Sequence, residues 1–447
     1  MRCHKMGRPE PDPQRQFSPV HNRACSHRRM ATAFLARVGV CQTGQKKSIF
    51  AAAFGADKPV RPSPIPYQTV TAPVVREPFL EILSFLDHIS IIEDHRVPGM
   101  VTYPLNEVLL TTLVGLICRA ADFDEIELTG LEQLDWLRQF LPFEHGVPQA
   151  QTFRKIFRLL DPKYLETAFS AWVESLRVHV GGGVAIDGKT LRGSKQAAGG
   201  DGALHLVSAY AHEAGLVIGQ RAVNAKSNEI TAIPELLDAL VLNGAIVTID
   251  AMGTQKLIAA KLIDKGADYV LALKGNQGTL HDDVRDFFAD PDLLRECARH
   301  DDTCIGHGRI EERTCQVADA SAWLTEQHSG WAGLASIAAV IATRTDKKSG
   351  EVSSETRLYI SSLPPDPKTI LNACRSHWSV ENNLHWQLDV TFREDECRTR
   401  KDHAPLSLAI IRHAAFNMLK REPSKMSIKR KRLKAAMNQA FRKTVIC

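Results

Sequence analysis

The chain has 447 residues, enough for about three domains. Its apolar share of 44% and charged share of 24% exclude a wholly disordered chain, a collagen-like rod and a disulfide-dense miniprotein. The net charge of +5 is too small to indicate nucleic-acid binding by itself, but the charge is unevenly distributed. Residues 1–50 hold ten Lys and Arg against two acids, residues 420–447 hold ten against one, and the middle of the chain is acidic.

The ten cysteines show no C-x-x-C spacing, so we expect neither a zinc framework nor disulfides. A cytoplasmic protein in a reducing compartment is the expectation that follows. The apolar run Val108–Cys118 is about half the length needed to cross a bilayer and predicts a buried helix.

Residues 1–76 form a basic, Pro-punctuated extension with no sustained periodicity. Its composition favours a disordered tail, and a DNA-contacting arm or an unused upstream start are the alternatives. Residues 77–178 have helical periodicity and predict an all-helical domain. Its expected helices begin at Phe79 and continue through Leu105–Ala121, Leu128–Gln139, Gln151–Leu160 and Pro162–Val178.

In residues 179–285, short apolar runs alternate with segments of helical periodicity. This pattern predicts a mixed α/β layer fold. The expected strands are Val184–Asp187, the hairpin partners Ala203–Ala211 and Leu216–Ala222, Ala245–Asp250 and Asp268–Leu273. The expected helices are Asn228–Leu240 and Thr254–Lys265.

Residues 286–364 predict a β-rich block, with strands at Arg309–Val317, Ser336–Thr343 and Thr356–Ser361. Residues 365–420 again have helical periodicity. Residues 421–447 form a basic C-terminal tail, in which Leu433, Met437 and Phe441 recur every four residues. This spacing predicts a helix that docks its apolar stripe on the core and turns its cations outward to bind phosphates; a frayed tail is the alternative.

Two carboxylates stand where apolar strands are expected to end, Asp187 and Asp250. Because burying a lone charge is costly, an acid at such a position is poorly explained by packing. Side chains at strand ends project into the cleft where α/β folds bind their ligands. The alternative for each aspartate is a cap on the following loop.

The segment His377–Asp389 offers a third acid, since His377, Glu381, His385 and Asp389 recur every four residues along one helical stripe. Trp378 and Trp386 indicate that this helix is packed, so that its polar stripe faces a cleft. Three carboxylates without a cysteine site suit Mg²⁺ or Mn²⁺. A zinc site at His377, Glu381 and His385 is the less favoured alternative.

A rival motif overlaps the first aspartate. Residues Gly183–Thr190 match the nucleotide-binding pattern G-x-x-x-x-G-K-[ST], and Ile246–Asp250 could serve as its second strand. That loop should follow a strand and open into a helix. Here its interior is itself an apolar strand and a glycine-rich segment follows, so an ATPase is the alternative rather than the main prediction.

Several segments together resemble insertion-sequence transposases of the DDE superfamily, in the ISAs-type group that includes the H-repeat-associated proteins. The matching segments are AIDGKTLRGS (185–194), TIDAMGTQ (248–255), LKGNQ (273–277), HGRIEERT (307–314), RLYISSL (357–363), RSHWSVENNLHWQLDVTFREDECRTR (375–400) and the ending at 403–420. The resemblance covers about residues 77–420.

The resemblance implies an RNase H-like catalytic core with a β-rich insertion, preceded by a helical transposase-associated domain. It implies that Asp187, Asp250 and Glu381 are the catalytic acids that hold two Mg²⁺ or Mn²⁺ ions, and that the protein acts as an oligomer on the ends of its element and on target DNA, in the bacterial nucleoid. A DNA-binding protein that has lost catalysis is the alternative. The expected phosphate contacts are Lys189, Lys274, Arg309, His377, Lys429, Arg430, Lys431 and Arg432.

The chain departs from a wider signature of these transposases at three positions. That signature places Tyr, Arg and Lys at −7, −4 and +7 from the glutamate, where this chain has Cys374, His377 and Leu388. His377 could substitute for the arginine.

Overall fold

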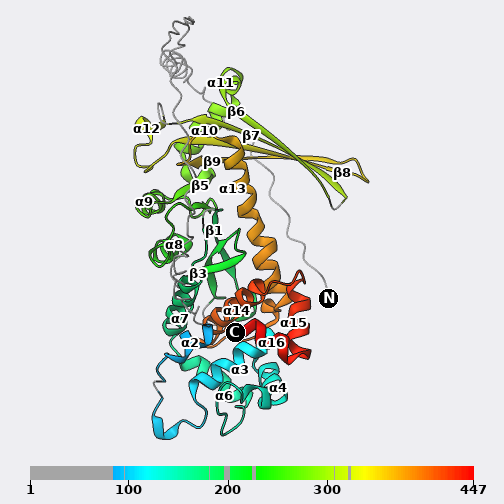
Figure 1. The fold of residues 1–447 in the computed structure, drawn as a ribbon. Coiled ribbons are helices and arrows are strands. Elements are labelled where there is room, and N and C mark those ends of the chain that lie inside the picture. The colour runs from blue at the N-terminus through cyan, green and yellow to red at the C-terminus, as the bar shows by residue number, and fades with distance from the viewer. Residues whose placement is uncertain are drawn as a thin grey trace, which may run out of the picture. The chain divides into compact units, whose positions relative to one another are not determined.

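A computed structural model describes residues 84–94, 96–180, 182–195, 202–223, 228–306, 308–320 and 324–446, all within the unit 70–447 (Figure 1). The predicted extension 1–76 and the helix start expected at Phe79 lie outside these residues. No helix among those described is long and apolar enough to cross a bilayer.

The N-terminal part is all helical, as predicted. Its helices are α2 (Phe85–Ser90), α3 (Leu105–Ile117), α4 (Phe123–Glu132), α5 (Leu134–Leu137), α6 (Ala150–Leu159) and α7 (Pro162–Ser175). Three of these helices, α2, α4 and α7, begin at a side-chain N-cap. The cap residues Ser84, Asp122 and Asp161 each accept a hydrogen bond from a backbone N–H of the first turn. The apolar run at Val108–Cys118 lies in α3 and its C-cap and is buried, as expected.

One sheet of nine strands forms the centre of the molecule, in the order β3-β2-β1-β4-β5-β9-β8-β7-β6. Its first five strands are β1 (Val184–Thr190), β2 (His205–Ala211), β3 (Leu216–Val223), β4 (Ile246–Ile249) and β5 (Asp268–Leu273). β1, β2 and β3 pair antiparallel, whereas β1, β4 and β5 pair parallel. This arrangement confirms the predicted RNase H-like α/β core.

Helices cover both faces of this core. Residues alternate between the faces along a strand, so Thr248 and Ile249 of β4 point to opposite sides. Ile249 lies toward α8 (Glu229–Asp238), which packs with α9 (Lys256–Asp264). Thr248 lies toward α13 (Pro367–Val380), because its hydroxyl is 3.1 Å from His377 Nδ1.

The remaining strands form an antiparallel ribbon that joins the core through β9 and β5. They are β6 (Ala298–Gly306), β7 (Arg309–Asp319), β8 (Ser336–Asp346) and β9 (Val352–Ser361), with α10 (Thr279–Ala289), α11 (Pro291–Glu296) and α12 (Leu324–Gln327) beside them in the chain. Leu273 ends β5 opposite Leu358, and β9 continues back to Val352. At about 3.3 Å per residue the ribbon extends about 20 Å beyond the edge at which β1, β4 and β5 end.

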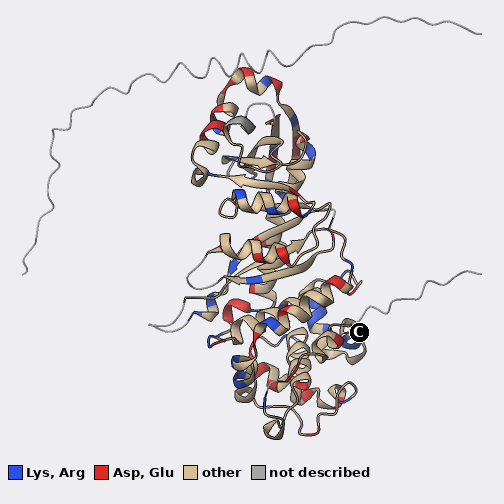
Figure 2. Ribbon diagram, turned by 90° about the vertical axis from the view of Figure 1, so that its left-hand side faces the viewer, with Lys and Arg blue, Asp and Glu red and all other residues tan. Residues whose placement is uncertain are grey.

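β6 was not predicted, because its sequence lacks the pattern of a strand. Its sequence ARHDDTCIG has no apolar alternation, and seven of its nine residues are exposed. Its long pairing with β7 holds it in place instead. Basic and acidic residues both occur along these strands (Figure 2). Arg299, Arg313 and Arg357 each pair with a carboxylate of the same four strands.

The helix after the ribbon is not α-helical throughout. α13 ends at Val380, and the chain continues as two π-helical turns, η4 (Glu381–His385) and η5 (Gln387–Thr391). Its packed side chains are Val380, Leu384 and Leu388, whereas Trp378 and Trp386 are 52% and 50% exposed. The prediction that the tryptophans pack this helix was therefore wrong, although the helix is packed.

The last helices link the N-terminal part to the core. α14 (Ala404–Arg421) has 15 of its 18 residues buried and contacts α3, α6, α7 and β3. β3 is an edge strand, and Asn417 of α14 provides hydrogen bonds for one of its residues. The Asn417 side chain accepts from the Val217 N–H and donates to the Val217 C=O.

The C-terminal segment forms α15 (Ile428–Met437) and α16 (Gln439–Ile446). The predicted apolar stripe was wrong, because Leu433 and Met437 are exposed and Phe441 alone is buried. α15 instead buries Ile428, Lys431, Arg432 and Ala435, so two of the cations expected to face outward lie inside. Carbonyl oxygens of other helices accept their hydrogen bonds, which a sequence pattern does not reveal.

A buried group of charges connects these parts. Glu394 accepts hydrogen bonds from Lys189 of β1 and from Arg412 of α14, at 2.7 and 2.8 Å. Burial raises the pKa of Glu394, but Arg412 and Lys189 outweigh burial and lower it to about 2 from an ordinary 4.5. The carboxylate is therefore ionised and holds two cations at once.

We predict that Glu394→Gln lowers the free energy of unfolding by about 3–5 kcal/mol, because it leaves buried Arg412 without its counter-charge and leaves Lys189 with Asp389 alone. The pKa of Glu394 is lowered by folding, so its contribution is complete above pH 4.5 and is lost as pH falls towards about 2. The difference in free energy of unfolding between the wild type and Glu394→Gln, measured with urea, should therefore become smaller as pH falls from 4.5 towards about 2. Glu396→Gln, at a side chain that is 70% exposed, is the matched control. A difference under 1 kcal/mol, or one that does not change with pH, would contradict this.

Candidate active site

Asp187 and Asp250 lie side by side on neighbouring strands. Asp187 is in the middle of β1, not at its end as predicted, whereas Asp250 directly follows β4 as predicted. β1 and β4 pair in parallel with Ile186 opposite Ile249, and each aspartate is the next residue of its chain segment. Neighbouring strands are about 4.8 Å apart, so this register brings the two acids together. Both follow by two positions the pair Ala185 and Thr248, and therefore lie on the face covered by α13.

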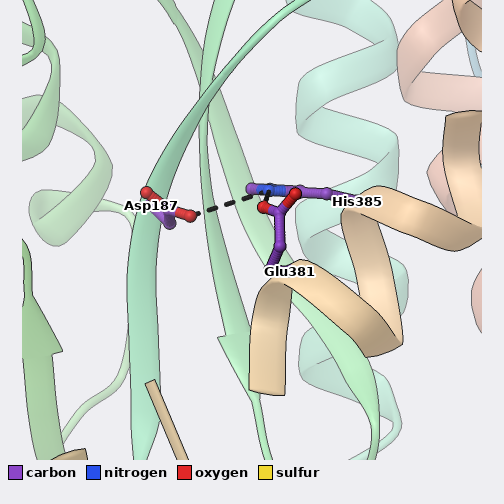
Figure 3. A group of neighbouring side chains, drawn as sticks. All are labelled: Asp187, Glu381 and His385. Atoms are coloured by element: carbon purple, nitrogen blue, oxygen red, sulfur yellow. Dashed lines mark hydrogen bonds and ion pairs between the residues drawn. The ribbon is translucent and has the colours of Figure 1, made fainter. Parts of the chain in front are cut away.

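Glu381 reaches the same place from the helical side. It begins the π-helical segment one turn beyond His377, which is anchored on Thr248. Ligand atoms of Asp187, Glu381 and His385 lie within 4.8 Å of one another (Figure 3). The structure thus brings Asp187 and Glu381 together. Asp250 lies beside Asp187, and its Oδ1 accepts from the N–H groups of Met252 and Gly253.

His385 is a member of this cluster that the sequence suggested only for the less favoured zinc site. It is buried, and its Nδ1 is 3.0 Å from Glu381 Oε2 and 3.6 Å from Asp187 Oδ2. Its spacing of four from Glu381 was the available signal. His377, the histidine that was assigned, bonds to Thr248 and is not in the cluster; burial lowers its pKa to about 4. The zinc alternative therefore loses one of its three ligands.

The cluster is electrostatically poised for a cation. Burial raises the pKa of Asp187 to about 6, and the charges of Asp250 and Glu229 act in the same direction, against His385 and the Gly188 N–H. Carboxylates that repel one another in a buried place are stabilised by a bound metal ion. Oxygen ligands from three acids suit Mg²⁺ or Mn²⁺, and one imidazole is compatible with Mn²⁺.

Lys189 holds the helix of Glu381 against β1. Its side chain is 10% exposed, and its Nζ lies 2.6 Å from Asp389 Oδ1 and 2.7 Å from Glu394 Oε2. Asp389 belongs to the same π-helical segment as the cluster. The ammonium of Lys189, an expected phosphate contact, thus pairs with two carboxylates of the protein and joins β1 to this helical segment.

The ATPase alternative does not fit this geometry. Residues Val184–Thr190, which would form the phosphate loop, are one strand that pairs with β2 along its length and with β4 over its first three residues. Of the residues described directly after it, up to Lys195, Arg192–Ser194 form a single 3-10 turn, η2, and none is α-helical. Lys189, which would bind the nucleotide, is the lysine held by Asp389 and Glu394.

A cavity of about 590 Å³ adjoins Asp250. It is lined by Lys274, Arg285, Arg357 and His377, together with the apolar side chains of Phe288 and Trp378. The Arg357 guanidinium stacks 4.0 Å from the centre of the Trp378 ring, which is half exposed. Of the expected phosphate contacts, Lys274 and His377 therefore lie next to the acidic cluster.

The other expected phosphate contacts lie elsewhere. Arg309 is exposed at the far end of the ribbon, 3.0 Å from Glu311. Lys429 and Arg430 are exposed on α15, whereas Lys431 and Arg432 are buried there.

Comparison with known proteins identifies the family to which the chain belongs. A family described as "Transposase DDE domain" matches residues 179–418, and one described as "DDE_Tnp_1-associated" matches residues 86–173. The chain belongs to this family of DDE transposases, as the resemblance in its sequence predicted.

Two relatives from Escherichia coli are similar over most of their length. "Putative transposase YncI" of strain O157:H7 is 40% identical over 374 residues, which are 82% of this chain and 95% of the relative. "H repeat-associated putative transposase YhhI" of strain K12 is 38% identical over 376 residues, 82% of this chain and 98% of the relative. Among solved structures, a piggyBac transposase synaptic complex with hairpin DNA aligns with a TM-score of 0.39 at 12% identity, over 81% of this chain and 78% of that one.

We predict that His385→Asn weakens Mn²⁺ binding about 10–100-fold, because the imidazole either ligates the ion or orients Glu381 toward it. Isothermal titration of the metal-free protein measures the effect without any DNA. His179→Asn, at an exposed histidine outside the cluster, should bind Mn²⁺ like the wild type. Equal affinities of wild type and His385→Asn would remove His385 from the site.

Proposed function

We propose that this protein is the transposase of a bacterial insertion sequence, and that it cuts DNA strands at the ends of its element and joins them to target DNA. The observation that carries the proposal is the cluster of Asp187, Glu381 and His385, with Asp250 in register beside it. Membership of the DDE transposase family supports the same reaction class.

The acids Asp187, Asp250 and Glu381 would hold two Mg²⁺ or Mn²⁺ ions. The donor set fits, since it is rich in carboxylate oxygen, buried on the Asp187 side and free of cysteine. When bound, such a pair of ions activates the attacking oxygen and stabilises the leaving oxygen of a phosphodiester.

The chain's own groups would prepare this site. His385 bonds Glu381 through Nδ1 and so restricts the rotation of that carboxylate, whose side chain is 65% exposed. Thr248, through His377, and Lys189, through Asp389, fasten the helix on either side of Glu381. The two contacts, one to β4 and one to β1, hold the helix against these strands, and joint binding by Asp187 and Glu381 depends on that distance.

The reaction would proceed by two displacements at phosphorus. Water attacks the phosphodiester at the end of the element, one P–O bond forms as another breaks, and a 3′-OH leaves. That 3′-OH then attacks a phosphodiester of the target in the same way, and its proton passes to solvent. Neither displacement needs a covalent bond to the protein.

The DNA would lie along the edge of the sheet where the acids are. Lys274 and Arg357 line the cavity beside Asp250, and the ribbon with Arg309 at its end extends past this edge. Cutting both ends of an element requires two active sites, which favours a dimer or larger assembly on the DNA.

We predict that Asp187→Asn, Asp250→Asn and Glu381→Gln each lower strand cleavage more than about 100-fold, because each removes a ligand charge at nearly constant size. The assay follows Mg²⁺- or Mn²⁺-dependent cleavage of duplexes that carry the ends of the element. Binding to the same duplex in Ca²⁺ should stay within about threefold of the wild type.

Glu174→Gln, at an exposed acid of α7, is the control and should cleave normally. Near-normal cleavage by two of the three variants would show that the site is assigned wrongly. A wild-type protein that binds the ends but cleaves nothing with either metal would favour the alternative, a DNA-binding protein without catalysis.

A further inference from the structure

A second cavity of about 570 Å³ lies where the N-terminal helices meet the C-terminal segment, apart from the acidic cluster. Its walls come from α3 and its C-terminal turn, from α4, from the end of η5 and from α15. The charged side chains that line it are Arg119, Glu125, Arg393, Lys429 and Arg432.

The lining is strongly basic. Four cations face one carboxylate, that of Glu125, which already pairs with Arg393. Among the described residues, neither Arg119 nor Lys429 has a side-chain hydrogen bond or ion pair. The lining therefore holds an excess of about three positive charges, which Glu396, outside the lining, offsets in part through its 3.9 Å pair with Arg393. An anion would balance the remainder.

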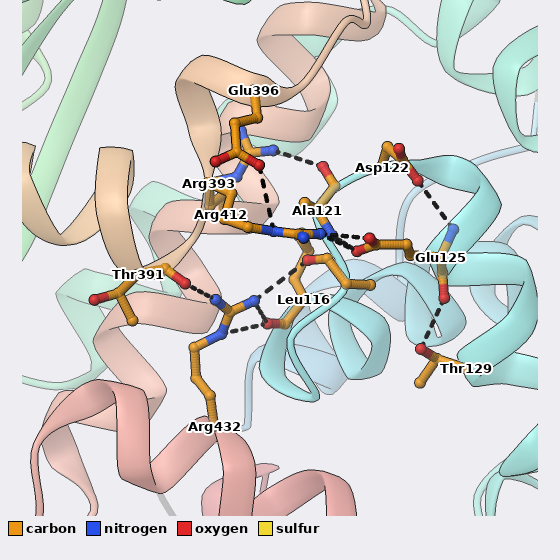
Figure 4. Close-up of polar contacts among 11 residues, drawn as sticks. Leu116, Ala121, Asp122, Glu125, Thr129, Thr391, Arg393, Glu396, Arg412 and Arg432 are labelled. Atoms are coloured by element: carbon orange, nitrogen blue, oxygen red, sulfur yellow. Dashed lines mark hydrogen bonds and ion pairs between the residues drawn. The ribbon is translucent and has the colours of Figure 1, made fainter.

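Arg432 supplies a buried charge without a carboxylate partner. The residue is 1% exposed, and its guanidinium donates to the carbonyl oxygens of Leu116, Ala120 and Thr391 (Figure 4). Arg412, equally buried nearby, has Glu394 as its counter-ion, whereas Arg432 has carbonyl dipoles and the face of the Phe392 ring, whose centre is 4.1 Å from the guanidinium carbon. Burial lowers the pKa of Arg432 to about 9, and the charges of Arg412, Arg119 and Arg393 add to the effect.

Two of the cations in the lining, Arg119 and Arg393, have a left-handed backbone conformation. Arg119 and Arg393 have φ values of +85° and +55°, in the left-handed region that residues with a Cβ seldom occupy. Such conformations cost about 1–3 kcal/mol each and concentrate at ligand sites. Both belong to the lining of this one pocket.

We propose that this pocket binds a phosphate group of a nucleotide, and that in the complex with DNA the group is a backbone phosphodiester. Guanidinium groups match phosphate oxygens in geometry as well as charge. Leu128 and Val390, which are 61% and 54% exposed, give the pocket an apolar lip for the sugar. The assignment to DNA rests on the proposed function; the phosphate site itself does not.

The pocket also touches the helix of the active site. Arg432 donates to Thr391, the last residue of η5, and Val390 and Arg393 lie in the lining. An anion there would neutralise the charges packed against the end of the segment that carries Glu381. DNA bound in the pocket would thus stabilise the helix that completes the acidic cluster.

The test compares two double variants that each remove two positive charges. Arg119→Gln/Lys429→Gln changes the exposed lining and spares buried Arg432, so the fold should be retained; circular dichroism verifies this. Lys425→Gln/Lys443→Gln changes two exposed lysines of the C-terminal segment outside the lining. Isothermal titration at constant ionic strength uses two probes, inorganic phosphate and a 5′-phosphorylated thymidine dinucleotide.

We expect the wild type and the Lys425/Lys443 variant to bind the dinucleotide at one site, and the Arg119/Lys429 variant to bind it at least about tenfold more weakly. In duplex binding followed by fluorescence anisotropy, the Arg119/Lys429 variant should have a salt slope shallower by about 0.9 per lost phosphate contact.

Each other outcome overturns part of the proposal. No binding of either probe by the wild type, or equal losses in both variants, would overturn the phosphate site. Loss of probe binding with unchanged duplex binding would overturn the assignment to DNA and leave a site for free phosphate compounds. If the probe results hold but the protein cleaves no DNA, the proposed function fails and the pocket stands.

Discussion

The contact of Lys189 with Asp389 and Glu394 is the interaction on which the rest of the site depends. It joins the strand that carries Asp187 to the helical segment that carries Glu381 and His385. Glu394 extends the contact to Arg412 of α14, the helix around which the N-terminal helices pack. A buried carboxylate that serves two cations is costly to form unless every partner is in place, so it favours one arrangement of strand and helix over others.

Arginine side chains extend the same principle to the N-terminal part of the protein. Arg432 donates to Leu116 at the C-terminal end of α3, and Arg412 donates to Ala121 in the connection from α3 to α4. Free carbonyl groups at a helix end are natural partners for guanidinium groups. The transposase-associated helices and the DDE core are therefore joined by directed hydrogen bonds as well as by apolar packing, and the basic C-terminal segment, rather than hanging free, supplies some of the cations.

The sequence predicted the parts of the site that local patterns encode. Asp187 and Asp250 follow short apolar runs, and their adjacency follows from parallel pairing of those strands. Glu381 was found from a four-residue stripe. The role of Lys189 was not predictable, because its partners lie about 200 residues away in the chain and their contact arises only on folding. His385 was visible in the stripe, but nothing local separates it from His377, which packs on Thr248 instead.

Other errors have the same origin. The tryptophans of the Glu381 helix were expected to be buried because of their size, yet the π-helical turns direct Leu384 and Leu388 inward. α15 buries Lys431 and Arg432 because carbonyl oxygens at helix ends accept their hydrogen bonds. A hydrophobic pattern in the sequence does not reveal such partners. Strand β6 is held by pairing rather than by burial, so its sequence carries no periodicity.

The central claim is that the helix fastened by Lys189 completes a metal site with β1 and β4. Anomalous diffraction from crystals soaked in Mn²⁺ tests it most directly, since the signal locates the ion without reference to activity. The account predicts a manganese peak in contact with the carboxylates of Asp187 and Glu381, with Asp250 in contact with the same ion or a second one. A manganese ion bound away from Asp187, or a fully soaked crystal with no ion between β1 and the Glu381 helix, would contradict it.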